Sequence, residues 1–276
     1  MPSIITLTTD FGLTGTYVAA MKAVILGINP EAKIVDVCHT ISPQNVHQAA
    51  LAIDSVIEYF PPKAVHVVVV DPGVGTRRKA IILRTPKADF VAPDNGVLSY
   101  MLGRCADLDQ DSTEPFEIDV PSQLEAVHLT KPEFWLPQVS STFHGRDIFA
   151  PVAARLSLGI DPLRMGERIS KLTALPVPKP QKGPNGEMAG EVIDVDSFGN
   201  LITNLKTEDL PEIIDAITIE VAGQKIHGLV STYGEGQGLI ALVGSSGRLE
   251  IAVRNGNAAA VLKAQAGDRV ALRTSP

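Results

Sequence analysis

The stretch Val65-His66-Val67-Val68-Val69-Val70-Asp71-Pro72-Gly73-Val74-Gly75-Thr76-Arg77-Arg78 decides the fold of this chain. It begins with a run of β-branched residues whose only polar member is His66, which is typical of a strand buried on both faces of a parallel sheet. The run ends at Asp71, where Pro72 and two glycines break the strand and let a ligand approach the backbone closely. The sequence therefore predicts a carboxylate at the carboxyl end of a central strand, where ligands bind in open α/β sheets.

Asp71 and the arginines that follow it form a candidate functional group. Arg77 and Arg78 both lie within reach of the carboxylate along the chain. A buried carboxylate beside a guanidinium is either a structural ion pair or the start of a catalytic group, and both interpretations stay open at this point.

Alternating strands and helices surround this stretch. From the spacing of apolar residues we expect strands at 4–9, 33–38, 79–84 and 90–92, and helices at 16–28 and 148–158. Another helix is expected to begin at Ser42-Pro43, an N-cap followed by a first-turn proline. This order favours an α/β domain with a largely parallel sheet. The segment 103–140, which mixes acidic residues and prolines, is expected to pack as a helical excursion.

A stretch rich in proline and glycine divides the chain into two predicted domains. Residues 173–187 hold four prolines and two glycines, which is typical of an exposed linker. Residues 1–172 form the predicted α/β domain. Residues 188–276 are predicted to form an all-β, barrel-like domain, because short β-rich segments alternate with turns there and no long helical pattern remains.

Composition and charge exclude several classes of function. The chain has 276 residues and a net charge of −7 with no basic stripe, which argues against a nucleic-acid partner. No apolar run reaches membrane-spanning length, and a strand-like segment begins at the first residues, so we expect no membrane association, no signal peptide and a cytoplasmic location. Cys38 and Cys105 lack the spacing of metal ligands, and no His-Glu-x-x-His pattern occurs, so no metal site is expected.

Polar side chains follow several predicted strands of the first domain. Asp10 follows the strand at 4–9, and Pro93-Asp94-Asn95-Gly96 is a turn signature that opens a short helix. His144 stands two residues before Arg146, which we expect to pair with a carboxylate. Each has a plain structural interpretation: Asp10 as a turn cap, His144 as a satisfied structural histidine, and Asp147 as a carboxylate facing a helix dipole.

Two turns of the second domain carry polar groups as well. They are Asp196-Ser197-Phe198-Gly199-Asn200 and the longer stretch from Gly244 to Ala258. By composition both are tight turns. As binding elements they offer amides, a carboxylate and backbone groups, which suit a zwitterion such as an amino acid, while an aromatic side chain such as Phe198 or Tyr233 could cover a base.

Seven short motifs occur in order along the chain. They are Thr-Thr-Asp-Phe-Gly, Val-Asp-Val-Cys-His, Asp-Pro-Gly-Val-Gly-Thr-x-Arg, Ala-Pro-Asp-Asn-Gly, Thr-Phe-His-Gly-Arg-Asp, Phe-Gly-Asn-x-x-Thr-Asn and Ser-Ser-Gly-x-Leu-Glu-Ile-Ala-Val. Each motif is weak alone, but the ordered set resembles one family, the S-adenosyl-L-methionine (SAM) hydroxide adenosyltransferases. These adenosine-forming SAM hydrolases are related to fluorinating and chlorinating enzymes that use the same substrate.

The resemblance implies both a fold and a site. It implies an N-terminal α/β domain, a C-terminal β-barrel, and a homotrimer that holds its substrate SAM between one subunit's N-terminal domain and its neighbour's barrel, with no cofactor. It places a hydroxide-generating triad on Asp71, Arg78 and His144. It assigns ribose contacts to Asp10, methionine contacts to Asp196 and Ser245, and other substrate contacts to Phe143, Phe198, Asn200, Tyr233, Asn255 and Ala258.

The implied reaction is hydrolysis of SAM to adenosine and L-methionine by attack of an activated water at ribose C5′. In the halogenating branch the positions of Asp71 and His144 hold other residue types, an aromatic in the first case, so water is the expected nucleophile here. Two alternatives remain open. One is a SAM-dependent halogenase, and the other is a non-catalytic protein that binds SAM or adenosine through a structural ion-pair cluster.

Overall fold

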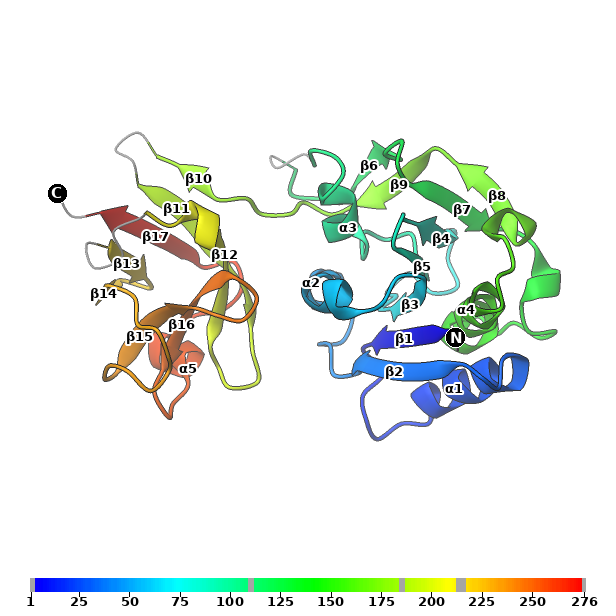
Figure 1. The fold of residues 1–276 in the computed structure, drawn as a ribbon, viewed down its shortest axis with the longest axis horizontal. Helices are drawn as coiled ribbons and strands as arrows, with labels where there is room; N and C mark the ends of the chain where they lie inside the picture. Colours follow the sequence, from blue (N-terminus) through cyan, green and yellow to red (C-terminus); the bar gives the residue numbers. More distant parts are fainter. Residues whose placement is uncertain (1–2, 109–111, 184–186, 212–216, 275–276) are drawn as a thin grey trace. The chain divides into compact units, whose positions relative to one another are not determined.

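The structure is a computed structural model that describes residues 3–108, 112–183, 187–211 and 217–274. The chain forms two compact units, one ending at Val177 and the other beginning at Pro178 (Figure 1). This division falls inside the predicted linker 173–187, of which 184–186 lie outside the described residues. The strand β9 (Lys171–Ala174) extends into that range, and the short strand β10 (Gln181–Lys182) lies within it.

The first unit is built on a seven-stranded sheet with the order β2-β1-β3-β5-β4-β7-β8. The strands are β1 (Ile4–Thr9), β2 (Lys33–Cys38), β3 (Ala64–Val69), β4 (Ala80–Arg84), β5 (Ala88–Pro93), β7 (Glu125–Leu129) and β8 (Gly166–Ile169). The strands β2, β1, β3 and β5 are parallel, whereas β4, β7 and β8 run antiparallel to their neighbours. The α/β class is thus confirmed, with a mixed sheet. The turn between β4 and β5 is too short for a crossover, so these two strands form a hairpin.

Helices cover both faces of this sheet. On one face, α1 (Tyr17–Ile28) and α4 (Ala150–Ser157) share a core with β1 and β3. On the other face, α2 (Val46–Val56) and α3 (Ser99–Gly103) pack against β3, β4 and β5. Every residue of β3 is buried, as the continuous apolar run predicts. A π-helical turn, η3 (Gly145–Phe149), leads directly into α4.

Two local expectations were wrong. The helix α2 begins at Val46 rather than at Ser42-Pro43, because the Asn45 side chain caps it by accepting a hydrogen bond from the Gln48 amide at 3.0 Å. The segment 103–140 is not a helical excursion: it contains β6 (Phe116–Asp119), which pairs with β9, and β7, which joins the main sheet between β4 and β8. These strands pair with distant segments, so local composition does not reveal them.

The second unit is an antiparallel barrel that is nearly closed. Its strand order is β14-β13-β17-β11-β12-β16-β15, with β10 beside β11, and the two ends β14 and β15 contact each other. The strands are β11 (Met188–Val195), β12 (Leu201–Lys206), β13 (Ile217–Val221), β14 (Gln224–His227), β15 (Leu239–Val243), β16 (Arg248–Val253) and β17 (Arg269–Thr274). A short helix, α5 (Ala258–Leu262), packs on the barrel core. The predicted barrel-like fold is confirmed. Among the described residues, no helix is long and apolar enough to span a membrane.

Candidate functional site

Three of the predicted site residues meet where β3 ends. Asp71 begins a loop that ends at Arg78, and the two side chains form two hydrogen bonds. Arg78 Nε donates to Asp71 Oδ1 at 2.9 Å, and Arg78 Nη2 donates to Asp71 Oδ2. The same Nη2 lies 2.8 Å from His144 Nδ1. The Arg78 and Asp71 side chains are only 10% and 5% exposed, so this contact is largely shielded from water. Arg78 and His144 lie 66 positions apart in the chain, so this guanidinium joins two distant segments.

The contact with Arg78 assigns the charge and tautomer of His144. A guanidinium has no acceptor atom, so the imidazole Nδ1 must accept the hydrogen bond and carries no proton. The neutral ring therefore holds its proton on Nε2. Burial and the positive charge of Arg78 lower the pKa of His144, while the carboxylates of Asp71 and Asp147 and a hydrogen bond with the Ser140 backbone oppose this with smaller effect. His144 is thus a neutral hydrogen-bond donor near pH 7.

The loop from Asp71 to Arg78 packs tightly against the segment that carries His144. Gly75 has a φ of +76°, and a Cβ there would lie 2.4 Å from the backbone oxygen of Ser141, so only glycine allows this approach. The Arg78 guanidinium also lies over the Phe149 ring, 5.3 Å from its centre. These contacts fix the loop against the π-helical turn that follows His144.

Asp147 supports this segment from within. It is fully buried in the first turn of η3, and its Oδ2 accepts hydrogen bonds from the amide and the hydroxyl of Ser140, both at 2.8 Å. Arg146 pairs with the same carboxylate, as expected, with Nε 2.5 Å from Oδ1. Burial alone would raise the pKa of Asp147, but the hydrogen bonds from Arg146 and Ser140 outweigh it and lower that pKa. Asp147 therefore stays ionised and holds the chain that leads into His144.

Asp10 and Phe143 lie at the same edge of the sheet. Asp10 follows β1, which pairs with β3 up to Thr9 and Val69, and its Oδ2 accepts a hydrogen bond from the Gln44 amide at 2.8 Å. Phe143 precedes His144, and its ring centre lies 5.0 Å from that of Tyr17, in an edge-to-face arrangement. The structure thus gathers the five residues predicted for the first unit around the ends of two adjacent strands.

In the second unit, most of the predicted residues gather around one turn. The Asp196 carboxylate accepts hydrogen bonds from the amides of Phe198 and Asn200 at 2.9 and 2.8 Å, and from the Asn200 side chain at 2.9 Å. These contacts hold the turn and leave Phe198 74% exposed. The Ala259 amide donates to the Gly199 carbonyl at 2.9 Å, which places the start of α5, with buried Ala258, against the same turn.

Tyr233, Ser245 and Asn255 occupy loops around β16. The Tyr233 hydroxyl donates to Glu250 at 2.5 Å, and burial together with Glu250 raises the pKa of Tyr233 to about 12. The charge of Asp196 acts on Tyr233 in the same direction, so these two predicted residues interact electrostatically. Ser245 is exposed in the turn between β15 and β16, and Asn255 follows β16 with a φ of +53°.

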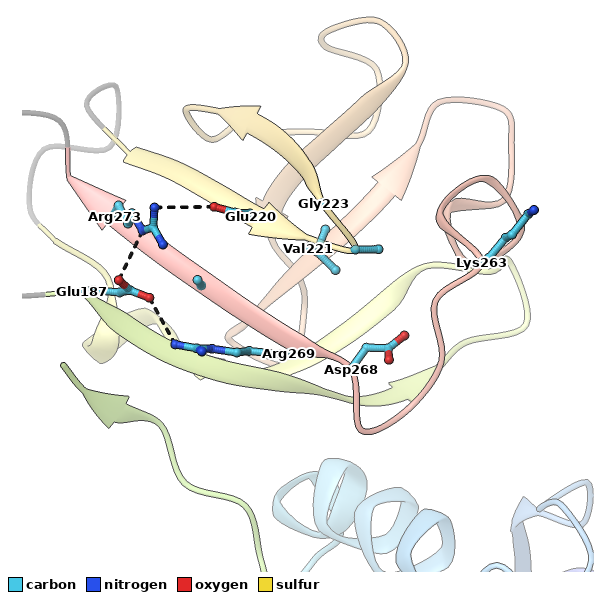
Figure 2. A pocket seen from close by; sticks show the side chains of 10 residues that line it. Glu187, Glu220, Val221, Gly223, Lys263, Asp268, Arg269 and Arg273 are labelled. Carbon is cyan, nitrogen blue, oxygen red and sulfur yellow. Dashed lines mark hydrogen bonds and ion pairs between the residues drawn. The ribbon is translucent and has the colours of Figure 1, made fainter.

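A separate hollow on the barrel contains none of the predicted site residues. Figure 2 shows Glu187 between Arg269 and Arg273, at 3.3 and 3.2 Å, and Arg273 extending to Glu220 at 3.7 Å. The arginines are more than half exposed, and the acidic and basic groups pair with each other, so this is a solvated ion-pair network. Within the part of the chain that the structure describes, no group of three His, Cys, Asp or Glu side chains is arranged to hold a metal ion.

Comparison with known sequences identifies the family. The profiles of the SAM hydroxide adenosyltransferase N-terminal and C-terminal domains match residues 5–166 and 190–271. The chain belongs to the SAM hydroxide adenosyltransferase family. The resemblance predicted from the ordered motifs is therefore confirmed.

Individual relatives agree with this assignment to the SAM hydroxide adenosyltransferase family. A protein from Salinispora arenicola named (R)-S-adenosyl-L-methionine hydrolase is 37% identical, over 96% of each chain. A fluorinase from Nocardia brasiliensis is 26% identical over 76% of this chain and 73% of that protein. Among solved structures, an uncharacterized conserved protein from Thermotoga maritima has a TM-score of 0.85 at 36% identity, covering 97% of this chain and 99% of that one.

Sequence reasoning did not single out two polar groups of this family member. Glu250 is 6% exposed and holds Tyr233, and a Cβ at the neighbouring Gly244 would lie 1.7 Å from its carboxylate. The sequence did contain a signal for Glu250, because it is a charged residue among the apolar residues of β16, in the motif Ser-Ser-Gly-x-Leu-Glu-Ile-Ala-Val. The other is Asn95, whose side chain contacts the end of β3 and which sequence analysis treated as part of a turn.

Proposed function

We propose that this chain hydrolyses SAM to adenosine and L-methionine. The proposal rests on the contact of Asp71, Arg78 and His144 at the carboxyl end of β3. It is supported by the match, over almost the whole length of the chain, to a protein named (R)-S-adenosyl-L-methionine hydrolase. An acid, a guanidinium and a neutral imidazole, drawn from distant segments, suit the positioning of one water molecule.

Hydrolysis of SAM needs few catalytic groups besides those that position this water molecule. The new bond joins the water oxygen to ribose C5′, the C5′–S bond breaks, and its electron pair goes to the sulfur, which leaves as the neutral thioether of methionine. The leaving group therefore needs no proton. Holding the oxygen in line with the C5′–S bond supplies about 7–11 kcal/mol of the barrier.

The two ends of the triad take different roles in this proposal. Neutral His144 donates its Nε2–H to the water oxygen and orients it, because Nδ1 is occupied by Arg78. Asp71 accepts the proton that the water loses: Arg78 contacts both of its oxygens, yet each keeps a lone pair free. Arg78 holds both groups in place, and its positive charge helps to lower the pKa of His144.

The rest of the proposed site comes from the family resemblance. We assign ribose contacts to Asp10 and methionine contacts to Asp196 and Ser245. The remaining proposed substrate contacts are Phe143, Phe198, Asn200, Tyr233, Asn255 and Ala258. The proposed assembly is a homotrimer that holds SAM between the first unit of one subunit and the barrel of its neighbour, and the proposed location is the cytoplasm.

The test is product analysis with purified protein and each sulfonium epimer of SAM, because the relative's name specifies the R form. We expect adenosine and methionine in equal amounts, with the same products when chloride or fluoride is added. A 5′-halogenated nucleoside would instead indicate a halogenase. Tight binding of SAM with no adenosine released would indicate a non-catalytic binding protein.

A further inference from the structure

The loop that carries Asp71 and Arg78 is held at both ends by two consecutive residues. The Asn95 side-chain amide donates to the carbonyl of Val70, the residue before Asp71, at 2.9 Å. The backbone amide of Asp94 donates to the carbonyl of Lys79, the residue after Arg78, also at 2.9 Å. One dipeptide at the end of β5 thus fixes the peptides that flank the loop on either side.

The Val70 carbonyl depends on Asn95 because the sheet no longer supplies a partner there. The pairing of β3 with β5 ends at Val67, and the pairing of β3 with β1 ends at Val69. Val70 is fully buried, and a buried carbonyl without a donor is costly. The Asn95 side-chain amide supplies the donor that a neighbouring strand would otherwise provide. It thereby orients the peptide that leads into Asp71.

The turn that carries Asn95 is itself held by other segments. The buried Asp94 carboxylate accepts a hydrogen bond from the Thr173 amide at 2.8 Å, and Asn95 Oδ1 accepts one from the Val97 amide at 3.2 Å. The Leu175 amide donates to the Ser99 hydroxyl at 2.6 Å. Because β9 and the chain after it hold the turn, Asn95 is a fixed reference point for the loop.

We propose that Asn95 is a positioning residue for the reaction, acting through the Val70–Asp71 peptide to set the direction of the Asp71 carboxylate. The inference rests on the proposed SAM hydrolysis and adds a residue that acts without touching substrate. Loss of the amide donor frees that peptide to rotate. Asp71 then presents its free lone pairs in a range of directions, while groups that bind SAM stay in place.

The test compares Asn95→Asp with Asn29→Asp. Asn29 is a control matched in its hydrogen bonds: it donates its side-chain amide to Ser157 Oγ at 2.8 Å and accepts from the Glu31 amide at 3.2 Å, as Asn95 does from Val97. We expect Asn95→Asp to lower kcat for SAM about tenfold or more with KM changed less than about twofold. Asn29→Asp should lower the melting temperature by a similar amount and leave kcat near that of the unaltered protein.

Three results would overturn the proposal. One is an Asn95→Asp kcat equal to that of the unaltered protein, and another is a kcat loss that Asn29→Asp reproduces. If Asn95→Asp fails to fold, Asn95→Ser replaces it, since a serine hydroxyl still accepts from Val97 but is too short to reach Val70. Failure of both variants to fold would make Asn95 a folding residue and not a positioning one. Absence of adenosine with the unaltered protein would instead refute the proposed function itself.

Discussion

At the scale of single residues, Arg78 decides what its two neighbours can do. Its guanidinium contacts both Asp71 oxygens and His144 Nδ1, so one group holds a carboxyl group and a neutral imidazole side by side. The sequence predicted the carboxylate at the strand end and an arginine within reach. It could not predict the partner histidine from spacing, because the contact depends on the packing of Gly75 against Ser141.

Replacing Arg78 by lysine should abolish most activity. An ammonium is a point charge without the planar fork that contacts Asp71 and His144 together, so one of the two contacts is lost. We expect Arg78→Lys to lower kcat about a hundredfold while SAM still binds, as measured by calorimetry beside steady-state kinetics. Arg77→Lys, at the adjacent and exposed arginine, is the matched control and should behave as the unaltered protein. Equal activity in the two variants would refute the role of Arg78.

The pH dependence of kcat should report His144. Protonation of Nδ1 removes the acceptor for Arg78, so activity requires the neutral ring and is lost as pH falls. Burial and Arg78 lower the pKa of His144 from its ordinary 6.5, so the loss should occur below that value. We expect kcat to be flat through neutral pH and to fall only in more acidic buffers. A decline centred at or above pH 6.5 would contradict this assignment.

At the scale of elements, the sequence of β3 was enough to predict its place as a central, buried strand. A continuous apolar run needs burial on both faces, and few arrangements other than a central parallel strand provide it. The helix cap at Asn45 and the strand β7 were missed for opposite reasons. The cap depends on which of several neighbouring polar side chains reaches a free amide, and β7 depends on pairing with the distant β4.

His66 makes β3 sensitive to acid. It is fully buried, its Nδ1 lies 2.8 Å from the Thr6 hydroxyl, it stacks on Phe90, and burial lowers its pKa to about 4. The folded state then binds fewer protons than the unfolded state, so stability is complete above pH 6.5 and is lost as pH falls toward 4. The loss should approach about 3 kcal/mol in the free energy of unfolding.

Urea unfolding across this pH window measures the effect. His66→Gln keeps a hydrogen-bonding group for Thr6 but cannot titrate, so this variant should be less stable at neutral pH and should lose less stability on acidification. The same acid-induced loss in the variant and in the unaltered protein would show that other groups are responsible.

At the scale of the whole molecule, the ordered motifs were more informative than any element. They predicted the family, which the full-length matches confirm, because the spacing of seven motifs is far more specific than a single turn. The proposed site draws residues from both units of the chain. Sequence patterns describe each unit separately, so the joining of the two halves of the site in a trimer stays a prediction.

Mixed trimers test that shared site. His144→Ala removes a group from the first unit, and Asp196→Ala removes one from the barrel, so each variant alone should be inactive. If each site combines two subunits, co-expression of the two variants should restore part of the activity, measured as adenosine release, because some sites then contain neither substitution. No recovery in oligomers shown by native mass spectrometry to be mixed would mean that each site lies within one subunit.

Incubation of the protein with SAM in ¹⁸O-labelled water, followed by mass spectrometry of the adenosine, tests directly whether water is the nucleophile. We expect one label at the 5′ oxygen of each adenosine formed, and loss of that product in Asp71→Ala. Adenosine without label, or labelled adenosine formed at an unchanged rate by Asp71→Ala, would contradict this expectation.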